Sequence, residues 1–491
     1  MTGVPHPRYE VVIGLEVHAQ LRTRSKLFSP APVTYGAEPN HSVHPVCLAL
    51  PGVLPVLNGH AVELAIRVAL ASQCHVHPQS IFARKNYFYP DLPKGYQISQ
   101  YEEPLATGGW LDVRMPDGNG GARKRVRLHR IHMEEDAGKS IHDAAVAGDA
   151  THVDLNRAGV ALLEIVSEPD LRSPAEAAAY LRALRSLLRY VDASDADMER
   201  GNFRCDANIS LRRHGESRLG TRTELKNLNS FRFVEAALEA EIRRQASLLD
   251  AGGKVVQATL QFDPASGRTR VLRLKENADD YRYFPDPDLV PLVLSDAQIE
   301  RVRKTLPEQA DARCERFQRQ HGLAEEDARL LCESRALADF FEAAAKRHGD
   351  AETLVNWIRR DVLHALGEHG IEIEASRLTP EALADLVERV RQGGVTAQSA
   401  RALIPELVLS GGDPLRLIQE RGLEAVSDTG ELEAAVDAVL REHAGHVERL
   451  RAGEEKVRNF LIGQVMKRTG GKADPAALRR VLAQRLGEGG S

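Results

Sequence analysis

All ten tyrosines of the chain lie between Tyr9 and Tyr283, although the sequence runs on to residue 491. A single hydrophobic core usually stops growing at about 250 to 300 residues, so a chain of this length is expected to form two or three domains. The loss of tyrosine marks a change in composition near Phe284. We therefore predict a domain boundary close to that residue.

The two parts carry different secondary-structure signals. Before the boundary, short β-rich runs such as VVIGLEV (11–17) and RVRLHRI (125–131) are separated by Gly and Pro turns, which is typical of strands. Four prolines occur from Pro285 to Pro307, and helical periodicity dominates after them. The prediction is an α+β chain in which a mixed-sheet domain is followed by helices.

Helix start and stop signals divide the second part further. Ser295 with Gln298 has the pattern of a capping box, and TPE at 379–381 supplies an N-cap, a first-position proline and a first-turn acid. The run GGDP at 411–414 predicts a break, and apolar residues recur at helical spacing from Leu432 onward. A second boundary is therefore expected near residues 405–412, with all-α regions on both sides.

Composition excludes some classes of protein. No apolar run approaches the ~20 residues of a membrane span, and the start of the chain lacks the pattern of a signal peptide, so a cytoplasmic protein without a membrane partner is expected. The formal net charge is -5, so any nucleic-acid contact has to come from a local basic surface. Five cysteines are an odd number in a long chain, which favours reduced thiols or a metal site over a disulfide framework.

Two short segments carry residues suited to metal binding. In GLEVH, a strand would point Glu16 and His18 to the same side, because strand side chains alternate with a period of two. In HMEEDAGKS, Glu134, Glu135 and Asp136 end a strand-like run beside a glycine turn. Adjacent carboxylates repel one another unless a cation offsets their charge, so this crowding favours Mg²⁺. A solvated acidic turn explains the same spacing and stays open.

A structural Zn²⁺ site is a separate prediction, from two pairs with two-residue gaps. His44 and Cys47 form the first pair, and Cys74 and His77 form the second. Such gaps are the spacing from which tetrahedral zinc sites are built. Mixed His and Cys pairs are less diagnostic than paired CxxC motifs, so ordinary buried cysteines remain the alternative.

Other segments are weaker signals when taken alone. Asp206 in RCDANIS and Glu224 and Lys226 in ELKNLNS add polar groups near β-like runs, but Asp and Asn more often serve turns. The aromatic clusters YFYP (87–90) and YRYFP (281–285) could stack on bases, although packing in the core is the better default.

Two nucleotide-site motifs fail on their context. AGKS at 137–140 mimics the end of a phosphate-binding loop, but Met133 stands where the first glycine is required. HAGH at 443–446 fits a pattern of class I aminoacyl-tRNA synthetases, yet no strand precedes it in this helical region. A synthetase is therefore disfavoured.

Seven long strings in chain order resemble one known family, the B subunits of the amidotransferases that act on glutamyl-tRNA(Gln) and aspartyl-tRNA(Asn). These strings are IGLEVHAQL, RKNYFYPDLPKGYQISQ, HMEEDAGKS, DLNRAGVALLEIVSEPDLRSPAEA, RCDANIS, ELKNLNSFRFVEAALEAEI and DYRYFPDPDL. The resemblance implies a cradle-shaped catalytic domain over 1–295, a helical domain over 296–405 and a tail domain over 406–491 that holds tRNA.

The resemblance also implies the reaction. The side-chain carboxylate of the misacylated tRNA is phosphorylated by ATP, and ammonia then displaces phosphate to give the amide. The chain has no amidase signature of its own. The resemblance therefore implies that an amidase (A) subunit releases the ammonia, and that a small C subunit joins both chains in a heterotrimer. A non-catalytic tRNA-binding or assembly factor is the alternative.

Site residues carry over by motif. His18 as a metal ligand would have to be neutral, so activity should fall at acid pH. Lys226 would neutralise phosphate charge. The resemblance implies a magnesium and phosphate site formed by Glu16, His18, Glu135, Asp206 and Glu224, with Glu134 and Lys226 nearby.

The last segment, residues 457–486, is rich in Lys and Arg. A local basic surface of this kind fits contact with the body of a tRNA. Such cations would contact the sugar-phosphate backbone without reading sequence. A solvated helical surface is the alternative, since helix ends favour Lys and Arg. The predicted tRNA-binding residues are Lys467, Arg468, Lys472, Arg479 and Arg480.

Overall fold

The chain forms two compact units, Met1–Gln309 and Ala310–Ser491, which we describe separately. The computed structural model describes residues 7–115, 122–141, 150–274, 281–425, 429–451, 454, 456–470, 473 and 475–486. None of the described helices is long and apolar enough to cross a membrane.

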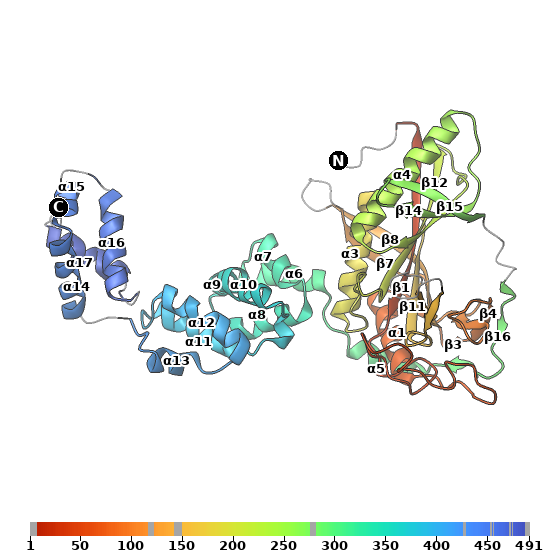
Figure 1. Cartoon of the computed structure of the whole chain (residues 1–491), viewed down its shortest axis with the longest axis horizontal. Coiled ribbons are helices and arrows are strands. Elements are labelled where there is room, and N and C mark those ends of the chain that lie inside the picture. Colours follow the sequence, from red (N-terminus) through yellow and green to blue (C-terminus); the bar gives the residue numbers. More distant parts are fainter. Residues whose placement is uncertain are drawn as a thin grey trace. The chain divides into compact units, whose positions relative to one another are not determined.

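A large mixed sheet dominates the first unit (Figure 1). In the described residues it has ten strands, in the order β15-β14-β13-β12-β1-β11-β8-β6-β2, with β7 paired to β8. Its pairs are antiparallel except for β13 and β14, which run parallel. The strands are β1 (Tyr9–Gln20), β2 (His75–Val76), β6 (Ala106–Thr107), β7 (Trp110–Arg114), β8 (Arg123–Glu135), β11 (Ala161–Ser167), β12 (Phe203–Arg213), β13 (Thr223–Leu228), β14 (Ala258–Asp263) and β15 (Arg268–Leu274).

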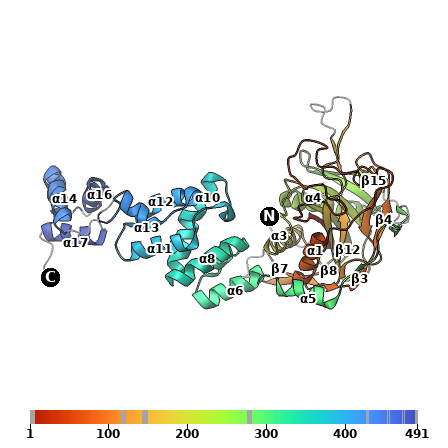
Figure 2. The same cartoon turned by 90° about the horizontal axis from the view of Figure 1, so that it is seen from below.

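Helices and smaller sheets complete the first unit. Helices α3 and α4 contact each other, and α4 also packs against β12. Helices α1 and α5 lie side by side (Figure 2). A small sheet has the order β16-β4-β5, and β5 contacts β8. These elements are α1 (Gly59–Ala71), β3 (Gln79–Ser80), β4 (Phe82–Asn86), β5 (Tyr96–Gln100), β9 (Lys139–Ile141), β10 (His152–Asp154), α3 (Pro174–Tyr190), α4 (Phe231–Asp250), β16 (Phe284–Pro285), β17 (Leu292–Val293) and α5 (Asp296–Lys304).

Strand β1 lies at the centre of the main sheet. It pairs with β12 on one side and β11 on the other. Residues such as Val11, Ile13, Leu15 and Val17 are buried, and the residues between them on the other face are mostly only half-buried. This alternation is the signature of a strand with one face packed in a core.

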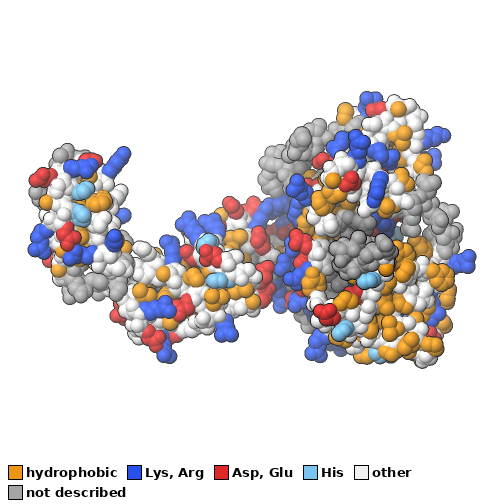
Figure 3. Space-filling view, viewed as in Figure 1, with side chains coloured by type: hydrophobic (Ala, Val, Ile, Leu, Met, Phe, Trp, Pro, Cys, Tyr) orange, Lys and Arg blue, Asp and Glu red, His pale blue; other side chains and the backbone are white. Residues whose placement is uncertain are grey.

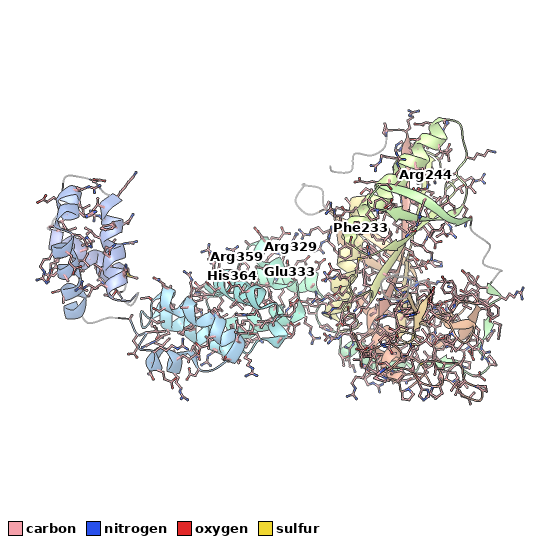
Figure 4. All side chains as sticks on the ribbon, viewed as in Figure 1. Phe233, Arg244, Arg329, Glu333, Arg359 and His364 are labelled. Atoms are coloured by element: carbon pink, nitrogen blue, oxygen red, sulfur yellow. The ribbon has the colours of Figure 1, made fainter. Side chains whose placement is uncertain are left out.

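Helix α4 is anchored to the sheet by Glu241, a carboxylate with no exposed surface. It accepts hydrogen bonds from Thr223 on β13 and Thr269 on β15, as well as from Gln245 on its own helix. Arg244, labelled on α4 in Figure 4, forms a bidentate pair with it. A buried charge with this many partners is fully compensated.

The second unit is helical, so the predicted α+β class is confirmed. The Thr379 N-cap forms at the start of α11, and the chain breaks between α12 and α13 at the predicted glycines. The predicted Ser295 capping box also forms, at the start of α5 in the first unit. The helices are α6 (Ala310–His321), α7 (Glu325–Leu331), α8 (Arg335–His348), α9 (Ala351–Trp357), η2 (Ile358–Val362), α10 (Leu363–His369), η3 (Ile373–Ala375), α11 (Pro380–Arg391), α12 (Ala397–Ser410), α13 (Pro414–Glu420), α14 (Thr429–Glu442), α15 (Ala444–Arg451), α16 (Lys456–Arg468) and α17 (Pro475–Leu486).

Two separate hydrophobic cores lie in the second unit. One extends from Cys314 to Ile418, and the other begins at Leu432. The predicted boundary at 405/406 falls inside α12, and α5, beyond the predicted boundary at 295/296, packs on α1 in the first unit. The three predicted domain ranges stay predictions.

Candidate functional site

The register of the main sheet aligns polar residues from four strands. His18 on β1 lies opposite Glu164 on β11, and Glu164 lies opposite His132 on β8. Glu16 lies opposite Asp206 on β12. Directly opposed residues of antiparallel strands share one face, so these side chains gather on the same side of the sheet.

Four of these side chains, together with Glu134 on β8, form what we call the carboxylate–imidazole cluster: Glu16, His18, His132, Glu134 and Glu164. Nε2 of His18 lies 3.3 Å from Oε2 of Glu164, 3.5 Å from Glu134 and 3.8 Å from Glu16. Nε2 of His132 lies 3.1 Å from the same Glu164 oxygen. Glu164 therefore joins the two imidazoles.

The pKa values of several groups in this cluster are strongly shifted. Burial disfavours the charged form of His18, but the hydrogen bond to Glu164 and the surrounding carboxylates outweigh it and raise its pKa to about 9. The pKa of His132 is raised to about 9 by the same balance. Burial raises the pKa of Glu16, with a contribution from the nearby charge of Glu164. Titratable groups whose pKa values are shifted and that cluster in this way are typical of functional sites.

A second polar group lies on the same sheet, on β12 and β13. Nζ of Lys226 donates to Asp206 at 2.9 Å and lies 3.5 Å from Glu224. Burial disfavours the charge of Lys226, but these two carboxylates prevail and raise its pKa. Glu224 in turn accepts a hydrogen bond from Thr259. Lys226 is therefore a fixed cation.

A pocket of about 700 Å³ opens over these residues, a size typical of sites for small ligands and cofactors. Its cations include Lys85, whose pKa is raised because nearby Tyr283, Glu134 and Glu164 outweigh its burial. The lining residues are Glu16, Lys85, Asn86, Tyr87, Phe88, Ser99, Gln100, Tyr101, Arg130, His132, Glu134, Glu164, Arg222, Glu224, Lys226, Gln257, Tyr281, Arg282 and Tyr283.

The aromatic clusters are not core residues as predicted. Phe88 is 92% exposed and Tyr89 is 55% exposed, while Tyr281 and Tyr283 line the pocket. The prediction was wrong because an aromatic run does not show whether a pocket or a core receives its rings.

Glu135 lies apart from the cluster. Its Oε1 accepts hydrogen bonds from Lys94 and from the backbone of Ile98. Because strand side chains alternate, Glu135 follows Glu134 toward the other face of β8. The structure thus does not bring Glu135 together with Glu16 and His18.

The four predicted zinc ligands do not converge. Among the described residues, the groups of three or more candidate ligands within 4.8 Å of one another are Glu16, His18 and Glu164, and His132, Glu134 and Glu164. Cys74 donates to the carbonyl of Gly108, and His77 contacts Thr107. Cys47 instead lies beside Lys26 and Ser29, while Nδ1 of His44 accepts from the backbone of Val46. A two-residue gap positions each pair but does not bring separate loops together.

Sequence reasoning did not single out Glu164, His132 or Lys85. A signal was available for Glu164, which is the one charged residue in the apolar run VALLEIV at 160–166; a buried acid needs a partner. His132 stands two residues before Glu134, so strand alternation puts both on one face. Nothing in the sequence marked Lys85.

The cluster fits a divalent cation. The carboxylates of Glu16, Glu134 and Glu164 supply the oxygen donors that Mg²⁺ prefers, and His18 adds a nitrogen donor. Because the pKa of His18 is raised to about 9, a cation bound there would displace a proton.

The predicted tRNA-binding residues lie on α16 and α17. Lys467, Arg479 and Arg480 are exposed. Arg468 is also exposed but forms an ion pair with Glu442, and Lys472 lies outside the described residues.

Comparisons with known proteins identify the family. Residues 11–300 match the GatB/GatE catalytic domain, and residues 339–486 match the GatB domain. The chain is similar to the B subunit of the aspartyl/glutamyl-tRNA(Asn/Gln) amidotransferase of an Anaeromyxobacter species, at 50% identity over 99% of this chain and 100% of that protein. It is 51% identical to the B subunit of the same amidotransferase from Moorella thermoacetica, over 97% of this chain and 100% of that protein. The chain therefore belongs to the B subunit family of tRNA-dependent amidotransferases.

Proposed function

We propose that the chain activates the side-chain carboxylate of a misacylated tRNA, Glu-tRNA(Gln), Asp-tRNA(Asn) or both, for conversion to the amide. The carboxylate–imidazole cluster, four of whose five members line the pocket, is the observation that carries this proposal. The pocket brings these acids and imidazoles together with the cations Lys85 and Lys226, the kinds of group that phosphate chemistry uses. The relatives named as B subunits indicate the substrate class.

The reaction has two steps. An oxygen of the substrate carboxylate attacks the γ-phosphorus of ATP, the bond to the β-phosphate oxygen breaks, and ADP leaves. Ammonia then attacks the acyl carbon, the bond to phosphate oxygen breaks, and nitrogen loses a proton to give the amide. Activation is required because a carboxylate is a poor acyl donor until one oxygen becomes a good leaving group.

Residues of the pocket have distinct roles in this proposal. Glu16, Glu134, Glu164 and His18 would hold Mg²⁺, which would supply positive charge to offset the charge of the transferred phosphoryl group. Lys85 remains charged because its pKa is raised, so it attracts phosphate or the substrate carboxylate. The part of the sheet around Lys226, with its fixed cation, orients the same anions.

Partner subunits complete the proposed enzyme. An amidase (A) subunit would release ammonia from glutamine, and a small C subunit would join both. The first unit exposes large hydrophobic side chains, including Val290 at 84% and Leu54 at 64%. Figure 3 shows hydrophobic side chains gathered over the lower part of this unit. Extended apolar surface of this kind supports docking to another protein.

Production of ADP by the assembled complex tests the proposal. The complex should release ADP only when both ATP and misacylated tRNA are present. Replacing Glu16 with glutamine should lower that rate by at least about 10- to 100-fold, since losing even an outer-shell partner of a metal costs this much. Glutamine hydrolysis by the partner should continue.

A matched control lies on the same strand. Glu10 on β1 pairs with Arg172 and Arg212 outside the pocket, so Glu10→Gln should retain the native rate. A wild-type complex that binds misacylated tRNA but makes no ADP would favour the alternative, a non-catalytic tRNA-binding subunit.

A further inference from the structure

Phe88 is an exposed ring in the lining of the pocket. Its side chain is 92% exposed, yet it lines the same pocket as the carboxylate–imidazole cluster. A phenylalanine that is exposed in a polar, charged pocket gains no stabilisation from burial in a core. An exposed aromatic face in such a place is suited to stacking on a planar ligand.

The turn around Gly95 leaves room for this ring. Gly95 has φ +71, and a Cβ at this position would lie 2.9 Å from Cε1 of Phe88. The carbonyl of Gly95 accepts a hydrogen bond from the backbone of Tyr87. The ring therefore lies over a glycine whose missing side chain makes room for it, and the rest of the ring stays open to a ligand.

Arg282 brings a cation to the same pocket in a strained conformation. Its φ is 45, an uncommon value for a residue with a side chain. The carboxamide of Asn86 donates to the carbonyls of Tyr281 and Arg282, at 3.1 and 2.8 Å, and so secures the turn. Within the described part of the chain, no acidic side chain forms an ion pair with Arg282. Its guanidinium is available for an anion.

An aromatic face and a guanidinium are two groups that together can bind a phosphorylated nucleoside. The base stacks on the ring, and the phosphate pairs with the cation. Resting on the function proposed above, we propose that Phe88 and Arg282 form a binding site for a 5′-phosphorylated adenosine, with Phe88 against adenine and Arg282 against the adjacent phosphate. Both substrates of the proposed reaction carry this unit, ATP as its nucleoside and tRNA as its 3′-terminal nucleotide.

Kinetics of the assembled complex test the site. Phe88→Ala should raise KM for one substrate by about 5- to 150-fold, the effect of losing one base–aromatic stack. The value of kcat should stay within about twofold, because uniform binding affects KM alone. Since Phe88 is so exposed, this change should leave the fold intact. Phe88→Trp should restore binding.

The source of the adenosine follows from which KM changes. An increase for ATP at saturating misacylated tRNA assigns the site to ATP, and an increase for misacylated tRNA at saturating ATP assigns it to the tRNA end. Tyr89→Ala is the matched control, because Tyr89 is an exposed neighbouring ring that does not line the pocket. It should change neither KM.

Three results would overturn the site. They are an unchanged KM for both substrates in Phe88→Ala, an equal effect of Tyr89→Ala, and loss of partner subunits from the Phe88→Ala complex, which would make Phe88 a contact between subunits. AMP binding, followed by saturation-transfer NMR, separates this site from the proposed function. If the wild-type complex made no ADP, the proposed function would fail, while AMP signals that disappear in Phe88→Ala would still support the site; their persistence would refute it.

Discussion

Replacing Glu164 with glutamine removes one negative charge from the carboxylate–imidazole cluster and keeps the size of the side chain. At the 3.3 Å between Glu164 and Nε2 of His18, two unit charges interact by about 5 kcal/mol at an effective dielectric constant of about 20. A cation bound in the cluster in place of the His18 proton would lose an attraction of this order to Glu164, which sets an upper limit of about 10³- to 10⁴-fold on the loss of the ADP-release rate. The lower limit is the ~10- to 100-fold loss seen when an outer-shell partner of a metal is removed.

The assay is ADP release by the assembled complex, with misacylated tRNA, ATP and a series of Mg²⁺ concentrations. We expect Glu164→Gln to need more Mg²⁺ and to remain at least tenfold slower at the highest concentration. Glu168→Gln is the control, because Glu168 also lies beside an imidazole, 3.1 Å from His129, but both side chains are partly exposed. Native rates in Glu164→Gln at low Mg²⁺ would show that the cluster does not bind the metal.

Three further outcomes are expected. Glu241→Ala should lower the free energy of unfolding of the first unit by about 3 kcal/mol, because buried donors lose their acceptor, whereas Glu239→Ala, which removes an exposed pair, should cost under about 1 kcal/mol in the same urea titration. Burial raises the pKa of the Cys74 thiol to about 11, so iodoacetamide should label it slowly at pH 8 until urea is added; rapid labelling of the native chain would contradict this. Replacing Arg479 and Arg480 together with alanine should lower the slope of log K against log salt for tRNA by about 1.4 to 1.8, and filter binding with an unchanged slope would place the tRNA elsewhere.

Short-range patterns in the sequence predicted local structure well. The spacing of Glu16 and His18 placed them on one face of a strand, and the caps at Ser295 and Thr379 marked two helix starts, because each signal depends on neighbours a few residues apart. The same alternation separates Glu134 from Glu135 once the strand is placed. The partners of Glu135, Lys94 and the backbone of Ile98, lie about 40 residues away in sequence, so no short-range pattern predicts them.

The composition of the site depends on long-range register. Glu164 lies opposite both His18 and His132 through pairings between segments far apart in sequence. No local pattern specifies that alignment, since a shift of one residue would point every side chain to the other face. The four predicted zinc ligands do not converge in the structure, and here too the spacing within each pair says nothing about how the two segments lie in space.

The central place of β1 has a consequence for synthesis of the protein. Strand β1 ends at Gln20, but its partner β12 ends only at Arg213. Ribosomes add about 5 to 20 residues per second. On the order of 10 to 40 seconds therefore pass between the synthesis of β1 and that of β12, and until then one edge of β1 has no partner strand. During that time its apolar residues and unpaired backbone groups are accessible to other chains. We expect ribosome-associated chaperones to bind such a nascent chain, and slower translation to lengthen the time for which β1 is exposed.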